Sequence, residues 1–445
     1  MKLEERVDAA SLRELAAFDP DEMVEDLDQI VESPKVSLRD LYYRWERTNW
    51  SARQLDFTDD VHDWKALGTD VTERLLWVMS MFFHGEECVT ATLAPWVDSA
   101  PTEEMQLFLA TQLADEARHT VFFDRFFGEV IGAHGDMRAR LDWCRPRVSP
   151  GFEKIFYEML PAVAKEVRDH PRDLAVFARG VAMYHILLEG TLAVPGQKYI
   201  LAFCRNRDVL SAFRSGFTAV ARDESRHVGA GVRILQELIA LDGDCADAVQ
   251  QLIREGLPHA IHQFQPPNAD FTYLTVLGYD TVELFRFGLF SFNKRLRAAG
   301  VAFPKIPPVR LPVLEHTPTF PERELTPVQQ MMRPMRDQIT PALVFQGLPM
   351  AFNAEASKGL HATYRFDITG EGGGTWMVKI SDGTCEIAQG AEPFDWRFEL
   401  DTETWIGMTT GDFMGQEAFM LGRVTVEGDP IVGMAFDQAF TPAAS

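Results

Sequence analysis

The sequence predicts two domains of different class, an all-α four-helix bundle followed by a small α+β domain. Up to about residue 303, apolar residues recur at helical spacing in long segments. Beyond residue 327 they alternate with polar residues in short segments that Gly and Asp interrupt, as in strands joined by tight turns. Residues 304–327, between the two patterns, contain seven prolines and are expected to form a stiff linker.

The composition excludes several classes of function. The net charge of -23 argues against nonspecific binding to nucleic acid and against docking on anionic membranes. The five scattered cysteines form no Cys-x-x-Cys pair, so we expect a reducing cytoplasmic location without disulfides or thiolate metal sites. No uncharged apolar run reaches about 18 residues, and the first residues lack an apolar signal core, so no transmembrane segment is expected.

The helical part follows an acidic N-terminal arm, residues 1–35, for which one or two short helices are expected. Within residues 36–303, four long apolar segments are each interrupted by charged residues, and helices of this kind pack as a bundle. The segments are residues 71–93, 102–130, 174–194 and 210–240.

The second and fourth segments carry the same pattern, Asp-Glu-x-Arg-His, at residues 115–119 and 223–227. In each copy the Glu and the His are three residues apart and therefore share a helix face. A single Glu-x-x-His is typical of a surface ion pair, whereas two copies inside long apolar helices indicate a buried site. The candidate ligands are Glu116, His119, Glu224 and His227.

The first and third segments each add an interior carboxylate, Glu86 or Glu87 in the first and Glu189 in the third. Burying an isolated carboxylate is costly, whereas two divalent cations neutralise four carboxylates. One Glu from each of two helices and Glu-x-x-His from each of the other two is the pattern of ferritin-like dimetal proteins. Ligands of oxygen and imidazole suit iron or manganese, and a carboxylate-bridged pair of these metals can activate O₂.

The residues beside the ligands predict a supporting polar network. A metal-bound His usually donates its other N–H to a carboxylate, so Asp115 and Asp223 are expected to serve the His of the opposite helix. His185 lies four residues before Glu189, on the same face, and is expected to support the site or pack in the core. Arg118 and Arg226 could close the network or pair outside the bundle, which the sequence leaves open.

The helical part resembles the ligand-binding oxidases related to the small subunit of ribonucleotide reductase. The resemblance covers roughly residues 36–300 and rests on LYYRWERTNWSARQLDFTDDVHDW, GEECVT, DEARH, YHILLEG and DESRH. It implies a Val three residues after the first Glu. Val89 stands at this distance from Glu86, so Glu86 is chosen over Glu87. It also implies a Tyr five residues before the third Glu, and Tyr184 stands at this distance before Glu189. It also implies a manganese–iron pair, a long-chain fatty acid in a channel, and an ether bond between the Val and Tyr side chains.

The same resemblance implies how the ligands divide between the metals, with Glu116 and Glu224 bridging. Two irons are the alternative cofactor, with O₂ as oxidant in either case. Val89 and Tyr184 are the candidate catalytic residues. Val89 shares a helix face with Glu86. In a regular helix Tyr184 lies off the face of Glu189, so contact between them requires a π-bulge or another geometry. Manganese is expected at Glu86, Glu116 and His119, and iron at Glu189, Glu224 and His227.

Other dimetal proteins are alternatives. A radical-generating reductase subunit is disfavoured because Phe123 stands four residues after the first His, where that family usually has a Tyr. Acyl carrier desaturases, arylamine N-oxygenases and monooxygenases acting on a carrier-delivered substrate remain competitors. Iron storage is disfavoured because it does not require a second domain.

The C-terminal part, residues 328–445, resembles sterol-carrier-protein lipid-binding domains, which have a five-stranded sheet with helices and a hydrophobic tunnel. The resemblance rests on YRFDITGEGGGTWMVKISDGTCEIAQG and LGRVTVEGDPIVGMAF. The triple glycine 372–374 is expected to form a turn rather than a phosphate loop, since neither a helix nor Lys-Ser/Thr follows it. Six apolar side chains are expected either to line a lipid tunnel or to pack in an ordinary core: Trp376, Trp396, Trp405, Phe413, Phe419 and Met420.

Together these features predict an O₂-activating dimetal oxidase that acts on or binds a long-chain fatty acid or similar lipid-like molecule. The alternative of another class is a lipid-binding protein whose metal site oxidises itself once and does not turn over. The expected partners are a hydrophobic carboxylate or lipid-like ligand, an external electron donor and a second copy of the protein in a homodimer. Nucleic acid is not an expected partner.

Overall fold

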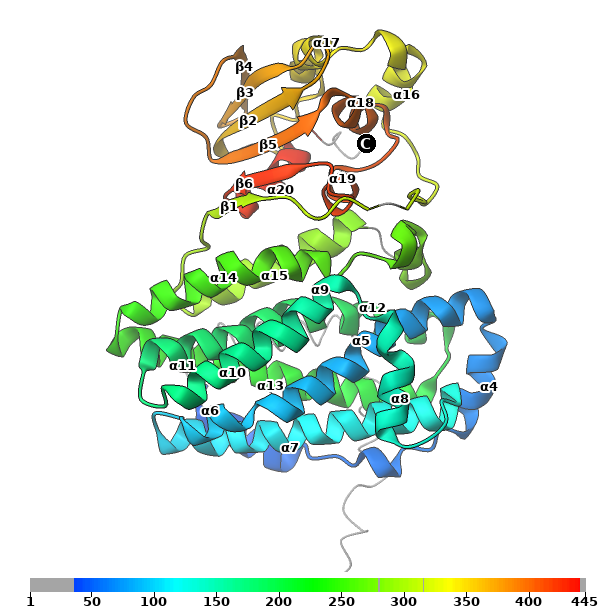
Figure 1. Cartoon of the computed structure of the whole chain (residues 1–445), viewed down its shortest axis with the longest axis vertical. Helices are drawn as coiled ribbons and strands as arrows, with labels where there is room; N and C mark the ends of the chain where they lie inside the picture. The colour runs from blue at the N-terminus through cyan, green and yellow to red at the C-terminus, as the bar shows by residue number, and fades with distance from the viewer. Residues whose placement is uncertain (1–35, 279–280, 315, 441–445) are drawn as a thin grey trace, which may run out of the picture. The chain divides into compact units, whose positions relative to one another are not determined.

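The computed structural model describes residues 36–278, 281–314 and 316–440, so the predicted N-terminal arm lies outside the described residues. The protein divides into two compact units, drawn in Figure 1. The first comprises Met1–Phe264, Tyr273–Tyr279 and Ser291–Ala302. The second comprises Gln265–Thr272, Asp280–Phe290 and Phe303–Ser445.

Every regular element among the described residues of the first unit is a helix, as the sequence predicts. The short helix η8 (Phe271–Leu277) and the longer helix α15 (Thr281–Ala298) contribute residues to both units. The remaining helices of the first unit are α3 (Leu38–Arg47), η2 (Ala52–Gln54), α4 (Thr58–Ala66), α5 (Thr69–Thr92), α6 (Ala94–Asp98), α7 (Glu103–Phe126), η3 (Phe127–Ile131), α8 (Met137–Cys144), η4 (Arg145–Arg147), α9 (Pro150–Phe152), η5 (Glu153–Met159), α10 (Leu160–Asp169), α11 (Leu174–Val181), η6 (Ala182–Ala193), α12 (Val194–Arg207), α13 (Ser211–Leu241) and α14 (Asp244–His262).

Helix α13 is the central element of this unit. It packs against α7, η6, α11, α12 and α14, and its side chains are buried on all sides along most of its length. A carboxylate from another helix caps its beginning, because the backbone N–H groups of Ala212 and Phe213 donate to Asp60 over 3.0 and 2.7 Å. This cap satisfies donors that a buried helix start would otherwise leave unpaired.

Helices α11, η6 and α12 follow one another without a break, and the middle one, η6, is a π-helix. A π-helix is wider than an α-helix, since its backbone bonds join residues five apart, and such segments are frequent at functional sites. The sequence does not predict a π-helix of this length. From the spacing of Tyr184 and Glu189, only a π-bulge or another local distortion is expected.

The second unit is an α+β domain built on a mixed sheet with strand order β1-β6-β5-β2-β3-β4. The pair β2 and β5 is parallel, and every other neighbouring pair is antiparallel. The elements are η7 (Pro267–Ala269), β1 (Ile306–Val309), α16 (Pro327–Met332), η9 (Arg333–Gln338), α17 (Pro341–Gly347), η10 (Leu348–Ala351), β2 (His361–Thr369), β3 (Gly374–Ser381), β4 (Thr384–Gln389), β5 (Trp396–Asp401), α18 (Thr402–Thr410), α19 (Gly415–Met420), β6 (Thr425–Gly428) and α20 (Pro430–Ala439).

The sheet has one strand more than the five that the resemblance implies. The additional strand, β1, comes from the proline-rich segment 304–327, which was expected to be a linker only. Two of its four residues are prolines, which a sheet tolerates at its edge because one side of an edge strand makes no ladder bonds. The division of the sequence at residues 303 and 328 stays a prediction.

The interior of the second unit is aromatic. The ring of Phe345 on α17 lies between two indoles, 4.7 Å from Trp376 and 5.0 Å from Trp405 between centroids, and stacks on both. All six side chains expected to line a tunnel or core are buried. The indole N–H groups of Trp376, Trp396 and Trp405 have no hydrogen-bond partner among the described residues.

The triple glycine forms a turn, as expected. Strand β2 ends at Thr369 and β3 begins at Gly374, so Gly372 and Gly373 lie in the hairpin connection. Gly372 has a φ of 68°, a conformation that side chains disfavour. None of the helices in the described residues combines the length and apolarity needed to cross a bilayer.

Candidate metal centre

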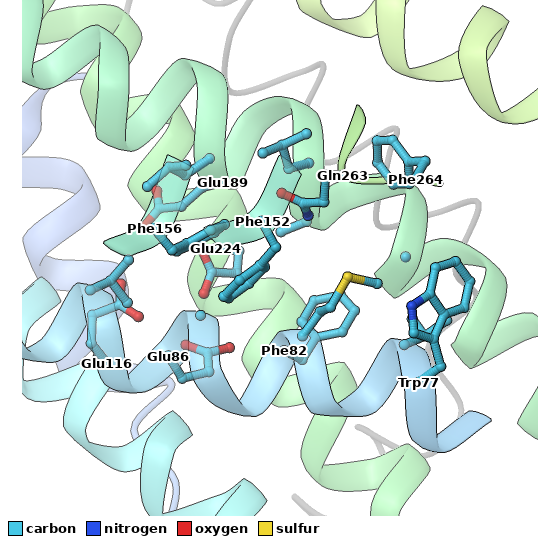
Figure 2. A pocket seen from close by; sticks show the side chains of 18 of the residues that line it. Trp77, Phe82, Glu86, Glu116, Phe152, Phe156, Glu189, Glu224, Gln263 and Phe264 are labelled. Carbon is cyan, nitrogen blue, oxygen red and sulfur yellow. The ribbon is translucent and has the colours of Figure 1, made fainter. Parts of the chain in front are cut away.

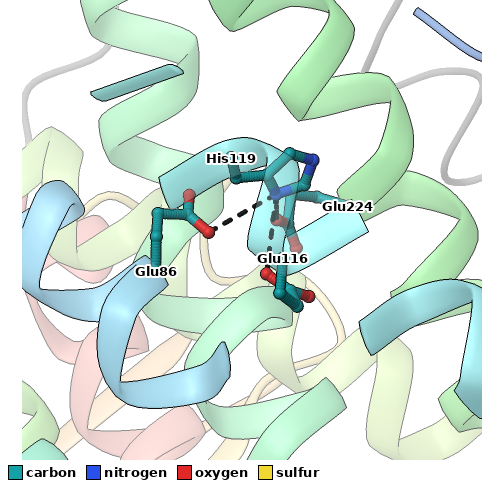
Figure 3. A group of neighbouring side chains, drawn as sticks. All are labelled: Glu86, Glu116, His119 and Glu224. Atoms are coloured by element: carbon teal, nitrogen blue, oxygen red, sulfur yellow. Dashed lines mark ion pairs between the residues drawn. The ribbon is translucent and has the colours of Figure 1, made fainter. Parts of the chain in front are cut away.

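The six predicted metal ligands come together inside the helical unit. They are buried, and they form two groups whose ligand atoms all lie within 4.8 Å of one another in each group. Figure 3 shows the group from α5, α7 and α13. The first group is Glu86, Glu116, His119 and Glu224, and the second is Glu116, Glu189, Glu224 and His227.

Each histidine faces three carboxylates through Nδ1. His119 Nδ1 lies 3.4 Å from Glu86, 3.5 Å from Glu116 and 3.2 Å from Glu224. His227 Nδ1 lies 3.2 Å from Glu116, 3.3 Å from Glu189 and 3.6 Å from Glu224. Glu116 and Glu224 therefore face both histidines, whereas the other two glutamates each face one.

The choice between Glu86 and Glu87 is clear in the structure. Glu86 is buried and points at His119, while Glu87 is partly exposed and lies 3.5 Å from Arg138 at the surface. Only Glu86 belongs to a group of potential ligands.

Several atoms of the two groups have no hydrogen-bond partner within the part of the chain that the structure describes. An unpaired buried polar atom costs roughly 1–3 kcal/mol, so a cluster of them requires an explanation. Carboxylate oxygens and imidazole nitrogens that converge without partners are suitable ligands for divalent iron or manganese, so these residues fit a dimetal centre. The unpaired atoms are His119 Nδ1, His227 Nδ1, Glu116 Oε1, Glu189 Oε2 and Glu224 Oε2.

The pKa values of the cluster diverge because the groups are buried together. Burial raises the pKa of Glu86 to about 8 and that of Glu189 well above its ordinary value. Burial also acts to raise the pKa of Glu116, yet the two neighbouring histidines hold it well below the usual range. Burial opposes protonation of both histidines, but the carboxylates around them, Glu86 foremost for His119 and Glu189 for His227, raise their pKa values well above normal.

A second layer of polar residues orients the histidines. His119 Nε2 donates to Asp223 over 3.2 Å, and His227 Nε2 donates to Asp115 over 3.1 Å. Each aspartate thus bonds the histidine of the opposite helix, which is the arrangement expected from the sequence. A bond at Nε2 fixes the ring so that Nδ1 faces the carboxylates. The role of the aspartates in metal binding stays a prediction.

The arginines of the two motifs close this network. Arg226 donates to Asp115 over 3.0 Å and to Asp223 over 2.7 Å, and Arg118 also contacts both aspartates. Burial acts to raise the pKa of Asp223, but the charge of Arg226 and the bond to His119 hold it well below normal. The question that the sequence leaves open is therefore settled in favour of the network.

Two tryptophans complete the layer and were not found from the sequence. Trp45 Nε1 donates to Asp115 over 2.8 Å, and Trp50 Nε1 donates to Asp223 over 2.7 Å. Both precede the bundle, at no fixed spacing from any ligand, so no periodicity indicates them.

His185 reaches the site through another residue. It belongs to neither ligand group; its Nε2 donates over 2.8 Å to Gln112, whose amide donates over 2.8 Å to Glu189. Burial lowers the pKa of His185 to about 3, so the ring is neutral at physiological pH. Gln112 was missed, although it lies four residues before Glu116 and so on the same helix face.

Tyr184 lies near the start of the π-helix η6, in which residues five apart lie closer to one face than they do in an α-helix. Its side chain is fully buried and its hydroxyl has no hydrogen-bond partner among the described residues. Burial and the nearby carboxylates, Glu116 foremost, raise the pKa of this phenol well above normal. Val89 is buried on α5. A bond between Tyr184 and Val89 stays a prediction.

An apolar pocket opens at the carboxylates, and Figure 2 shows it from close by. In that view the glutamates lie toward one side, Trp77 and Phe264 toward the other, and Phe82, Phe152 and Gln263 between them. The lining residues are Trp77, Val78, Met81, Phe82, Gly85, Glu86, Val89, Glu116, Phe152, Phe156, Leu188, Glu189, Leu192, Ala193, Gly196, Glu224, Gln263, Phe264 and Leu274.

Residues 31–302 match the family model described as ribonucleotide reductase, small chain, which covers more than half of the sequence. The chain belongs to this family. Residues 347–441 match the SCP-2 sterol transfer family. Both resemblances stated from the sequence are therefore confirmed, as is the fold class of each part.

Solved structures similar to this protein include R2-like ligand-binding oxidases. One is a variant of an R2-like ligand-binding oxidase with anaerobically reconstituted Mn/Fe cofactor, 24% identical, with a TM-score of 0.52 over 61% of this chain and 95% of that chain. Another is the R2-like ligand-binding oxidase from Sulfolobus acidocaldarius, 24% identical, with a TM-score of 0.50 over 59% of this chain and 89% of that chain. At these identities the likeness establishes the fold.

Phe123 stands at the position where the sequence comparison with radical-generating reductase subunits expects a tyrosine. The ring of Phe123 is fully buried and packs against Phe122, Phe82 and Phe217 at centroid distances of 5.1, 6.0 and 5.8 Å. The position is filled by aromatic packing and offers no hydroxyl to oxidise.

Proposed function

We propose that this protein is an O₂-activating dimetal oxidase whose apolar pocket binds a long-chain fatty acid or a similar lipid-like carboxylate. The observation that carries the proposal is the convergence of unpaired buried carboxylate and imidazole atoms at one end of an apolar pocket. The fold shared with R2-like ligand-binding oxidases supports it.

The two ligand groups would hold one metal each. Manganese is proposed at Glu86, Glu116 and His119, and iron at Glu189, Glu224 and His227, with Glu116 and Glu224 shared between the metals. The manganese–iron pair is favoured over two irons because structures of this fold are described with an Mn/Fe cofactor. When bound, the metal pair supplies the chemistry that activates O₂.

The aspartates and the aromatic side chains around the metals are proposed to position the ligands and to exclude water, not to react. Asp115 and Asp223 keep Nδ1 of each histidine directed at the carboxylates. The aromatic walls at Phe82, Phe152 and Phe156 exclude water and bury a hydrocarbon tail. Two divalent metals would balance the four glutamates, but two trivalent metals would carry two further positive charges, which would favour the carboxylate of a ligand at the end of the pocket where the glutamates lie.

Val89 and Tyr184 are the residues proposed to react. Formation of an ether bond removes one hydrogen from a C–H group of Val89 and one from the O–H of Tyr184, and O₂ accepts the two electrons and two protons. The unpaired hydroxyl of Tyr184, buried near four carboxylates, supports this role because no hydrogen bond holds its proton.

The C-terminal domain, residues 328–445, is proposed to bind or deliver the lipid-like ligand. Its match to the SCP-2 sterol transfer family and its aromatic interior support this. An external electron donor and a homodimer are proposed as the protein partners of the oxidase.

The test is aerobic loading of the full-length protein with manganese and iron, followed by O₂ consumption with octadecanoic acid and a reductant. Anomalous diffraction at the two metal edges locates each metal. Repeated O₂ consumption supports an oxidase; a single stoichiometric event identifies a lipid-binding protein that oxidises itself once. Glu86→Gln should abolish metal at one position, whereas the control Glu87→Gln should leave both occupied.

A further inference from the structure

The pocket contains few polar groups apart from the glutamates of the metal centre. Of its remaining lining side chains, Gln263 carries a carboxamide and Trp77 an indole N–H, while the others are hydrocarbon, thioether or glycine. A small number of polar groups in an otherwise apolar pocket usually fixes the orientation of the ligand. Gln263, which carries the carboxamide, is therefore the candidate among the lining residues for fixing the orientation of a ligand.

Gln263 is buried without the hydrogen bond that burial normally requires. The residue is only 6% exposed, and its Oε1 has no hydrogen-bond partner among the described residues. A buried amide of this kind is destabilising unless a water or a ligand pairs with it. Figure 2 shows the side chain in the pocket, between the glutamates and Phe264.

The backbone holds Gln263 firmly in place. It directly follows α14, and its N–H donates to the His259 carbonyl over 2.9 Å. Gly151 packs against this turn so closely that a Cβ there would lie 2.3 Å from the Gln263 nitrogen and 2.6 Å from the His259 oxygen. The backbone that carries this side chain is thus fixed before any ligand binds, which limits where the amide can lie in the pocket.

We propose that the natural ligand carries a hydroxyl group part-way along its hydrocarbon tail, in addition to its carboxylate, and that Gln263 hydrogen-bonds this hydroxyl. This inference rests on the proposed function, since the carboxylate must lie at the metals for the tail to pass Gln263. A hydroxyl both donates and accepts, so it pairs with the amide whichever of its two polar atoms faces the pocket. The residue therefore selects hydroxy acids over plain acids of the same length.

The test compares octadecanoic acid with a series of hydroxyoctadecanoic acids that differ in the position of the hydroxyl. Affinity is measured by calorimetry on the metal-loaded, full-length protein. One position should bind about ten-fold more tightly than the plain acid, because a hydroxyl would pair an amide that the plain acid leaves unpaired. Gln263→Met should abolish this preference while retaining binding of octadecanoic acid.

Gln197→Met is the matched control. Gln197 is also buried, and neither of its amide atoms has a hydrogen-bond partner among the residues described. It does not line the pocket, so its replacement should leave the preference unchanged. Equal affinity of the wild type for the plain acid and every hydroxy acid would overturn the inference and leave the proposed function standing. Failure of all the acids to bind the metal-loaded protein would refute the proposed function itself, and with it the inference.

Discussion

Replacement of Gly231 by alanine tests how tightly the central helix packs on the π-helix. Gly231 lies on α13, and a Cβ there would be 2.2 Å from Cβ and 2.6 Å from Cγ of His185 on η6. His185 cannot simply turn away, because it is fully buried and bonded to Gln112, which bonds Glu189. The backbones of the two helices must therefore separate.

Overpacking of this kind costs about 1–3 kcal/mol. At about 2–4 °C per kcal/mol for a domain of this size, Gly231→Ala should lower the melting temperature of the helical unit by about 2–12 °C. Gly243→Ala is the control, since its Cβ would meet nothing within 4 Å and its φ of -63° is helical. That change should leave stability unaltered or raise it by up to about 1 kcal/mol.

The assay is differential scanning calorimetry of the metal-free, full-length protein, in which the transition that rises on metal loading identifies the helical unit. Metal content after loading provides a second measurement, because separation of the helices also displaces Gln112 from Glu189. If Gly231→Ala had the melting temperature of the wild type and retained both metals, the close contact between α13 and η6 would not limit stability, and the reasoning would be wrong.

Further predictions concern the network, the crosslink, the second domain and the helix cap. Asp223→Asn should weaken metal binding about 10–100-fold in a chelator competition. Asp124 lies on α7 outside the network, so the control Asp124→Asn should leave metal affinity unchanged. Aerobic metal loading should lower the intact mass by two hydrogen atoms, and Tyr184→Phe should prevent this; an unchanged mass in the wild type would contradict the proposed ether bond. Phe345→Ala should cost about 3–5 kcal/mol in the second unit, seen in urea unfolding by near-UV dichroism. Burial raises the pKa of Asp60, so folding favours its protonated form. The free energy of unfolding of the wild type, measured relative to Asp60→Asn, should therefore fall as the pH rises past the ordinary carboxyl pKa.

The convergence of the candidate ligands could be predicted from the sequence because burial of charge has few solutions. Glu116, His119, Glu224 and His227 lie on helices too apolar to expose them, and only convergence on cations balances four interior carboxylates. The pairing of each aspartate with the opposite histidine follows from the same helix faces. Local spacing is sufficient for the two Glu-x-x-His pairs, whereas the pairing across helices follows only once the four helices are assumed to form one bundle.

The rest depends on contacts between distant parts of the sequence. Trp45 and Trp50 meet their aspartates across sequence separations of 70 and 173 residues, which no local pattern encodes. The extent of the π-helix η6 and the pairing of β1 with β6 are likewise decided by tertiary packing. Gln263 could not be distinguished from any other glutamine until the pocket was known.

The sharing of Glu116 and Glu224 between the two histidines has a consequence for how the centre fills. A cation that binds one group engages two carboxylates that the other group also needs, and Arg226 bonds the aspartates behind both histidines. The two positions therefore form one thermodynamically linked unit in which occupancy of either changes the affinity of the other, by the same factor in both directions. Metal selectivity measured on a half-filled protein will differ from selectivity measured on an empty one, so the order of metal addition becomes part of the chemistry of the protein.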